Sequence, residues 1–139
     1  MPAALVDTGV IVAAFGANQP QRTRYMALFK TAAEEQWSLA TTWPCIVELS
    51  FLLSPPQRFT ALRWVAARGI AVFPFAQEAL EPMVALMQQY TEAPRTEMDL
   101  ADASLVWLAG DSDVTRIMTL DVRDFSRYRL PDGRGFEIL

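Results

Sequence analysis

The stretch Ala-Ala-Leu-Val-Asp-Thr-Gly, residues 3–9, decides the fold, because in it a short apolar segment stops at an acid. Residues 3–6 predict a buried strand, and Asp7-Thr8-Gly9 predicts the turn that ends it. Late in the chain, Arg-Ile-Met-Thr-Leu-Asp shows the same pattern, a short largely apolar segment that ends at Asp121. Open parallel sheets bind their ligands at the carboxyl ends of their strands. We therefore expect Asp7 and Asp121 at the functional edge of such a sheet.

Helical patterns alternate with strand-like segments along the chain, which is typical of an α/β fold with a mostly parallel sheet. We expect five strands, at residues 3–6, 38–41, 70–73, 116–119 and 136–139. We expect helices at residues 10–14, 22–35, 44–53, 57–67, 78–90 and 98–109. Ser54-Pro55-Pro56 should stop the third helix, while Gly69 and Gly110 should end the fourth and the sixth. Right-handed crossovers then give a three-layer α/β/α sandwich, with residues 1–139 as a single domain.

The composition is that of a compact globular protein, with 52% hydrophobic and 20% charged residues. Cys45 is the single cysteine, so an internal disulfide is excluded and a reducing, cytoplasmic compartment is expected. Asp7 interrupts the apolar N-terminal stretch, which also lacks the basic start of a signal peptide. No run approaches the ~18 apolar residues of a membrane span, so we expect no membrane association.

The chain contains no histidine, which removes Ser-His-Asp and Cys-His catalysis and imidazole metal sites. Any catalysis must therefore use carboxylates, hydroxyls, basic residues or a metal ion. The net charge of −4 argues against nonspecific wrapping of nucleic acid, although a locally basic face is compatible with it.

Four acids lie in apolar surroundings, where a carboxylate without a partner is costly. Asp7 and Asp121 end strands, whereas Glu48 and Asp102 lie about one turn into their helices. Four carboxylates on one rim repel each other unless a cation neutralises them, and all-oxygen ligation favours Mg²⁺ or Mn²⁺. Such a site suits phosphodiester hydrolysis, because the metal ion activates water and stabilises charge on the phosphate.

Some of these acids have simpler interpretations. Asp7 could be a turn former, and Glu48 could pair with a neighbouring arginine. Thr96-Glu-Met-Asp99 fits a capping box, so we interpret Asp99 mainly as a helix cap and assign Asp102 to the metal.

Three further residues could support the acidic site from outside it. Asp124 could cap a short turn at residues 125–128 or act as an outer acid of the site. The hydroxyls of Thr8 and Thr119 could orient a ligand or be ordinary turn hydroxyls.

The acidic blocks together resemble those of the PIN-domain family. They read Leu-Val-Asp7-Thr-Gly-Val-Ile, Ile-Val-Glu48-Leu, Leu-Ala-Asp102-Ala-Ser-Leu-Val and Thr-Leu-Asp121-Val-Arg-Asp-Phe, in the family order and across nearly the whole chain. The resemblance implies an Mg²⁺- or Mn²⁺-dependent endoribonuclease, with these four acids as its catalytic and metal-binding residues. Leu120 departs from the pattern, because many relatives carry a polar or basic residue there.

Short members of this family are commonly VapC toxins of toxin–antitoxin pairs. The resemblance therefore implies an RNA substrate, a homodimer, and a VapB-like antitoxin whose tail blocks the site. A noncatalytic PIN-like module that binds RNA or protein is the alternative, although all four acids are present. A receiver domain is disfavoured because Lys30 is the only lysine, and a haloacid-dehalogenase-type phosphatase because Gly9 replaces its second aspartate.

Arginines concentrate near the end of the chain, where they could form a basic lip that binds phosphate. The arginines of this segment are Arg116, Arg123, Arg127, Arg129 and Arg134, of which we expect Arg123, Arg127 and Arg129 to contact RNA. An equally good alternative pairs them with Asp124 and Asp132. Trp43, Phe51 and Trp64 could line an apolar groove for an antitoxin helix or a second subunit.

Overall fold

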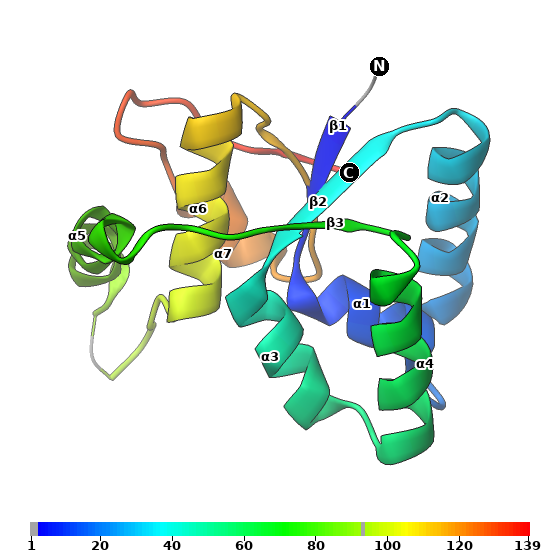
Figure 1. Cartoon of the computed structure of the whole chain (residues 1–139). Coiled ribbons are helices and arrows are strands. Elements are labelled where there is room, and N and C mark those ends of the chain that lie inside the picture. Colours follow the sequence, from blue (N-terminus) through cyan, green and yellow to red (C-terminus); the bar gives the residue numbers. More distant parts are fainter. Residues whose placement is uncertain (1–2, 93) are drawn as a thin grey trace.

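The computed structural model describes residues 3–92 and 94–139, and its five strands form one parallel sheet. The strand order is β3-β2-β1-β4-β5, so β1 lies at the centre (Figure 1). The strands are β1 (Ala3–Val6), β2 (Ser38–Thr42), β3 (Ala71–Phe73), β4 (Arg116–Met118) and β5 (Glu137–Ile138). The predicted five-stranded parallel sheet is confirmed.

Helices connect the strands and cover both faces of the sheet (Figure 1). They are α1 (Thr8–Phe15), α2 (Arg22–Glu34), α3 (Trp43–Leu52), α4 (Pro55–Ala66), α5 (Leu80–Tyr90), α6 (Leu100–Ser112) and α7 (Val122–Arg127), with a 3-10 turn at Gln77–Ala79. One layer consists of α1, α2 and α4, and the other of α5, α6 and α7. The chain therefore has the expected α/β/α sandwich fold.

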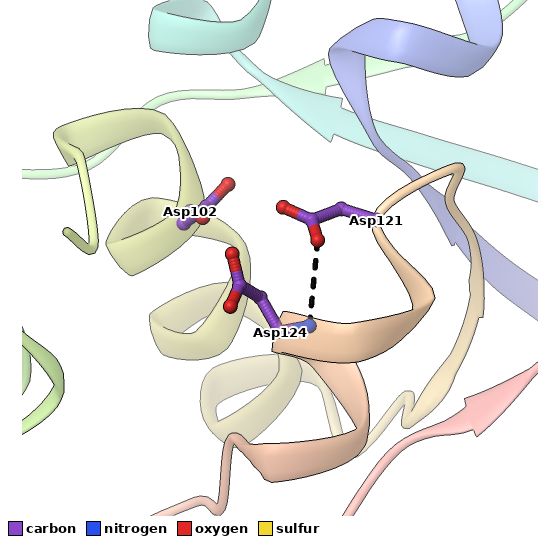
Figure 2. Close-up of side chains that lie close together, drawn as sticks. All are labelled: Asp102, Asp121 and Asp124. Carbon is purple, nitrogen blue, oxygen red and sulfur yellow. Dashed lines mark hydrogen bonds between the residues drawn. The ribbon is translucent and has the colours of Figure 1, made fainter. Parts of the chain in front are cut away.

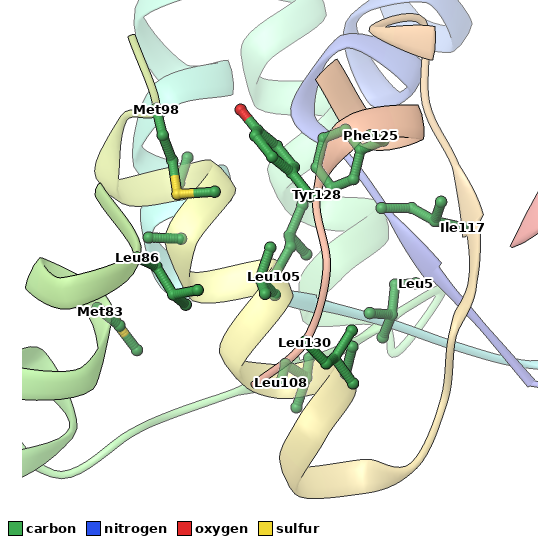
Figure 3. Close-up of a cluster of buried hydrophobic side chains, with 14 of the residues drawn as sticks. Leu5, Met83, Leu86, Met98, Leu105, Leu108, Ile117, Phe125, Tyr128 and Leu130 are labelled. Carbon is green, nitrogen blue, oxygen red and sulfur yellow. The ribbon is translucent and has the colours of Figure 1, made fainter. Parts of the chain in front are cut away.

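Successive residues of β1 pack into different cores, as the period of two in a strand requires. Leu5 packs with α5, α6 and α7, whereas Ala4 and Val6 pack with α1, α2 and α4. All three side chains are completely buried. Figure 3 shows the first of these cores, in which Leu5 lies near Ile117 and Leu130. A central strand buried on both faces explains why its sequence is continuously apolar.

Helix boundaries differ from the predictions at the start of α4 and at two glycines. Helix α3 ends at Leu52, before Ser54-Pro55-Pro56, as predicted. The two prolines also begin α4 two residues earlier than expected, because a first turn has no need of the missing N–H. Gly110 lies inside α6, which continues to Ser112 and ends at left-handed Asp113. Packing of the neighbouring α6 residues in the core outweighs the cost of about 1 kcal/mol for a helical glycine.

Gly69 has a different role from the predicted helix end. The left-handed residue after α4 is Arg68, with a φ of 65°. A Cβ atom at Gly69 would collide with the Trp64 ring, so the glycine permits this close approach of backbone and indole. Within the described parts of the chain, none of the helices combines the length and the apolar character that crossing a membrane requires.

Candidate metal centre

The carboxyl ends of β1 and β4 place Asp7 and Asp121 at one edge of the sheet, as the sequence predicts. The Asp7 N–H donates to the Met118 carbonyl at 3.0 Å, which continues the pairing of these strands by one residue. Asp7 is also the N-cap of α1, with its Oδ1 accepting from the Thr8 N–H at 2.8 Å. The sheet and the helix start therefore fix this carboxylate together.

Thr119 joins the two strand-end acids through its hydroxyl. Its Oγ1 donates to Asp7 Oδ2 at 2.7 Å and accepts from the Asp121 N–H at 2.9 Å. Thr119 is 1% exposed, so both bonds form away from bulk water. This side chain is a fixed link between the two acids, whereas Thr8 makes a longer contact of 3.4 Å to Glu48 Oε2.

Helix α6 brings Asp102 to the same edge and begins one residue after Asp99. The Asp99 carboxylate is the N-cap, and its Oδ1 accepts from the Asp102 N–H at 2.8 Å. The helix begins at Leu100 rather than at residue 98, so the predicted capping box with Thr96 is wrong. The reason is local, because the Asp99 carboxylate accepts from the Asp102 N–H at the start of the helix instead of reaching back to the Thr96 N–H.

Three carboxylates converge between α6 and α7. Oxygen atoms of Asp102, Asp121 and Asp124 all lie within 4.8 Å of one another, and Figure 2 shows the three side chains pointing toward a common space. Asp121, not Asp124, is the N-cap of α7, and it accepts from the Asp124 N–H at 3.3 Å. Asp124 is therefore not the helix cap. It belongs to the converging group, whereas Asp7 and Glu48 lie outside it.

Burial and mutual repulsion disfavour the ionised forms of these acids. Burial, followed by the charges of Asp99 and Asp7, raises the pKa of Asp102 to about 8. Burial also raises the pKa of Asp7 to about 6, with Glu48 and Asp121 adding to the increase. The pKa values of Glu48 and Asp121 are raised as well, again chiefly by burial. A site that collects carboxylates against this cost calls for a cation.

The donor set fits a divalent metal ion. Carboxylate oxygens are hard ligands, and three of them within reach of one point form the kind of set that Mg²⁺, Mn²⁺ or Ca²⁺ accepts. The Asp7 charge contributes to the raised pKa of Asp102, and the Glu48 charge contributes to the raised pKa of Asp7. Asp7 and Glu48 form a second, outer part of the same acidic edge.

Tyr128 also belongs to this site, although nothing in the sequence pattern indicated it. Its hydroxyl donates to Asp102 Oδ2 at 2.8 Å, across 26 residues of sequence. No motif relates the two positions, so only the fold brings them together. Burial, together with the Asp102 charge, raises the pKa of Tyr128 well above its ordinary value.

The arginines expected to contact RNA lie on or just after α7. Arg127 pairs with Asp124 at 3.3 Å, and the Arg129 guanidinium donates to the carbonyls of Ser126 and Tyr128. Arg123 is exposed on the same helix. Their contact with RNA remains a prediction.

Two other arginines lie elsewhere. Arg116 begins β4, so it sits at the opposite edge of the sheet, where it stacks on Trp37 and pairs with Glu137. Arg134 pairs with Asp113 at 2.8 Å, at the loop before that strand. The prediction of a basic lip that includes these two residues is therefore wrong, because both lie near the beginning of β4, whereas the acids follow its end.

An apolar groove of about 630 Å³ adjoins the acids. Its apolar wall comes from α3, the segment after β3, and the start of α6: Trp43, Pro44, Val47, Phe51, Phe75, Leu100 and Ala101. Glu48 and Asp99 form its polar side. Trp64, expected here from the sequence, instead packs against Phe15 and Phe29 on the other face of the sheet.

Comparisons of sequence find no family model and no curated protein that match the chain. Solved structures do match. The VapC20 toxin of Mycobacterium tuberculosis, described as cleaving the sarcin–ricin loop, gives a TM-score of 0.69 at 14% identity, covering 87% of this chain and 92% of its own. The VapBC2 complex of Rickettsia felis, bound to a promoter DNA fragment, gives 0.68 at 16% identity over 99% and 98%.

A toxin–antitoxin complex from Klebsiella pneumoniae matches with a TM-score of 0.60 at 19% identity, over 98% of this chain and 95% of the other. At such low identity these likenesses establish the fold. The chain has the PIN-type α/β fold of VapC-type toxins, and the resemblance inferred from the four acidic blocks is confirmed at that level.

Proposed function

We propose that this protein is a metal-dependent endoribonuclease and the toxin of a toxin–antitoxin pair. The observation that carries the proposal is the convergence of Asp102, Asp121 and Asp124 within 4.8 Å, at the strand edge that also carries Asp7. The fold shared with VapC20, a toxin described as cleaving the sarcin–ricin loop, supports RNA as the substrate.

In this proposal the three converging acids hold Mg²⁺ or Mn²⁺, and Asp7 and Glu48 complete the acidic edge. The ion would supply an activated water and neutralise charge on the phosphate. The chain's own residues keep the carboxylates in place: Thr119 links Asp7 to Asp121, and Asp121 and Asp99 cap the helices that carry their neighbours. With no histidine in the sequence, carboxylates are the chain's only side chains that ordinarily accept protons near neutral pH.

Partners follow from the same reasoning. Two of the structural neighbours are complexes of a toxin with its antitoxin, which supports an antitoxin as the partner of this chain. None of the described residues that line the apolar groove beside Glu48 and Asp99 is basic, so the groove suits a peptide better than a phosphate backbone. We also propose that the protein forms a homodimer.

The direct test measures cleavage of a structured RNA with Mn²⁺ or Mg²⁺, with and without EDTA. The wild type is compared with Asp121→Asn, Asp124→Asn and Asp7→Asn, and with Asp111→Asn as a control on the exposed end of α6. We expect cleavage that EDTA abolishes and that falls at least about 100-fold in the three site variants but not in the control.

Cleavage that persists in EDTA or in all site variants would contradict the metal mechanism. RNA binding without any cleavage by the wild type would favour the noncatalytic alternative.

A further inference from the structure

Tyr128 connects the two helices that carry the converging acids. It is the first residue after α7, and its main-chain N–H donates to the Asp124 carbonyl at 3.0 Å. Its hydroxyl donates to Asp102 Oδ2 on α6 at 2.8 Å. One residue therefore contacts the peptide of one acid and the carboxylate of another.

Packing fixes the position of this hydroxyl. Tyr128 is 1% exposed, and its ring meets the rings of Phe125 and Tyr90 edge-on, with centroids 5.0 Å away in both cases. Figure 3 shows the Tyr128 ring beside Phe125, with its oxygen extending beyond the cluster of carbon atoms. Such edge-on pairs are favoured contacts of aromatic rings, so the ring has little freedom to turn away from Asp102.

We propose that Tyr128 is a positioning residue that orients the Asp102 carboxylate for the divalent metal ion. This inference rests on the proposed function, because it assumes that the carboxylate group binds an ion. A free carboxylate loses rotational freedom when it binds a metal, whereas one already held by a fixed donor has lost most of it beforehand. The Tyr128 hydroxyl occupies one side of Oδ2 and leaves the remaining lone pairs of the carboxylate available.

Outer hydrogen bonds of this kind have a measurable effect on metal sites. Removing a partner of a metal ligand typically weakens metal binding 10- to 100-fold. Tyr128→Phe removes the hydroxyl alone and keeps the ring between Phe125 and Tyr90. Tyr90→Phe is the matched control, because the Tyr90 hydroxyl accepts from the main-chain N–H of Arg129 at 2.9 Å and, among the described residues, is not hydrogen-bonded to any of the three acids.

The experiment titrates Mn²⁺ into the metal-free full-length protein by calorimetry, and measures thermal unfolding of each protein in EDTA. We expect Mn²⁺ affinity to fall about 10-fold in Tyr128→Phe and to change less than about 2-fold in Tyr90→Phe. Equal affinities of wild type and Tyr128→Phe would overturn the inference and leave the proposed function standing. A wild type that binds no Mn²⁺ would overturn both.

A double-mutant cycle distinguishes positioning from a general structural effect. If Tyr128 acts through the Asp102 carboxylate, Tyr128→Phe should cause no further loss of Mn²⁺ affinity in the Asp102→Asn background. An additional 10-fold loss in that background would show that the hydroxyl acts elsewhere. The same cycle remains decisive if Tyr128→Phe also lowers the melting temperature, because it compares binding by folded proteins.

Discussion

Asp102 bears a larger electrostatic cost than Asp7, and its carboxylate accepts a hydrogen bond from the Tyr128 hydroxyl. Burial and the charges of Asp99 and Asp7 raise its pKa to about 8, while the Tyr128 hydroxyl opposes this increase. A free carboxylate in the unfolded chain has a pKa near 3.8. The folded protein therefore retains a proton that the unfolded chain has lost throughout the range between these two values.

This difference in proton binding makes the stability of the metal-free protein depend on pH. As pH rises from about 4 to about 8, the unfolded chain binds fewer protons than the folded one, so the metal-free protein loses stability and then reaches a plateau. Asp102→Asn removes this loss. At pH 9 in EDTA we expect the variant to be more stable than the wild type by roughly 2 kcal/mol, or about 6 °C in Tm.

Thermal unfolding at pH 5 and pH 9 measures this difference, with Asp111→Asn as the control. Excess Mn²⁺ should reverse the order at pH 9, because it binds the ionised carboxylates of the wild type. A wild type as stable as Asp102→Asn at pH 9 in EDTA would contradict the assignment of a costly buried charge.

At the start of helix α6, one acid caps the helix and a different acid belongs to the site. Asp99 and Asp102 lie on one face of the helix start, and the sequence favoured Asp102 as the site carboxylate and Asp99 mainly as the cap. The structure gives Asp99 the N-cap and brings only Asp102 into the group with Asp121 and Asp124. The two acids therefore have different expected phenotypes.

Asp99→Asn should keep both stability and RNA cleavage within a few-fold of the wild type, because asparagine caps a helix as well as aspartate does. Asp99→Ala should lower the free energy of unfolding by about 1 kcal/mol. Urea denaturation and a cleavage assay on the same samples separate the two effects. Loss of cleavage in Asp99→Asn without loss of stability would assign Asp99 to the site instead.

At the scale of the whole molecule, large apolar side chains remain on the surface around α3. Phe51 is 82% exposed, Val47 55% and Trp43 51%, and all three line the groove beside the acids. A contiguous apolar surface of this kind marks an interaction site more often than a solvent-facing region. It is the natural place for the proposed second subunit or for an antitoxin segment.

We expect the protein to sediment as a dimer at micromolar concentration, and Phe51→Glu to shift it toward the monomer by placing a charge in the apolar contact. Phe59→Glu is the control, because Phe59 is 54% exposed on α4 and lies outside the groove. Sedimentation equilibrium measures both. A wild type that is monomeric across this range would count against the homodimer.

The sequence by itself determined the layers of this protein. Short apolar runs that end at acids indicated the parallel strands and the edge at which Asp7 and Asp121 lie. The sequence contains this information because buried strands require a local pattern of apolar residues. The same local reasoning was wrong at Gly110 and at the start of α4, where packing and first-turn geometry prevailed.

Only the tertiary structure decided which acids meet. Asp124 joins Asp102 and Asp121 because α7 lies against the start of α6, and Tyr128 joins them because its ring is wedged between Tyr90 and Phe125. Such contacts depend on the relative placement of two helices far apart in the chain. Neither the periodicity nor the spacing of residues predicts how these two helices are placed relative to each other, so only the tertiary structure could show it.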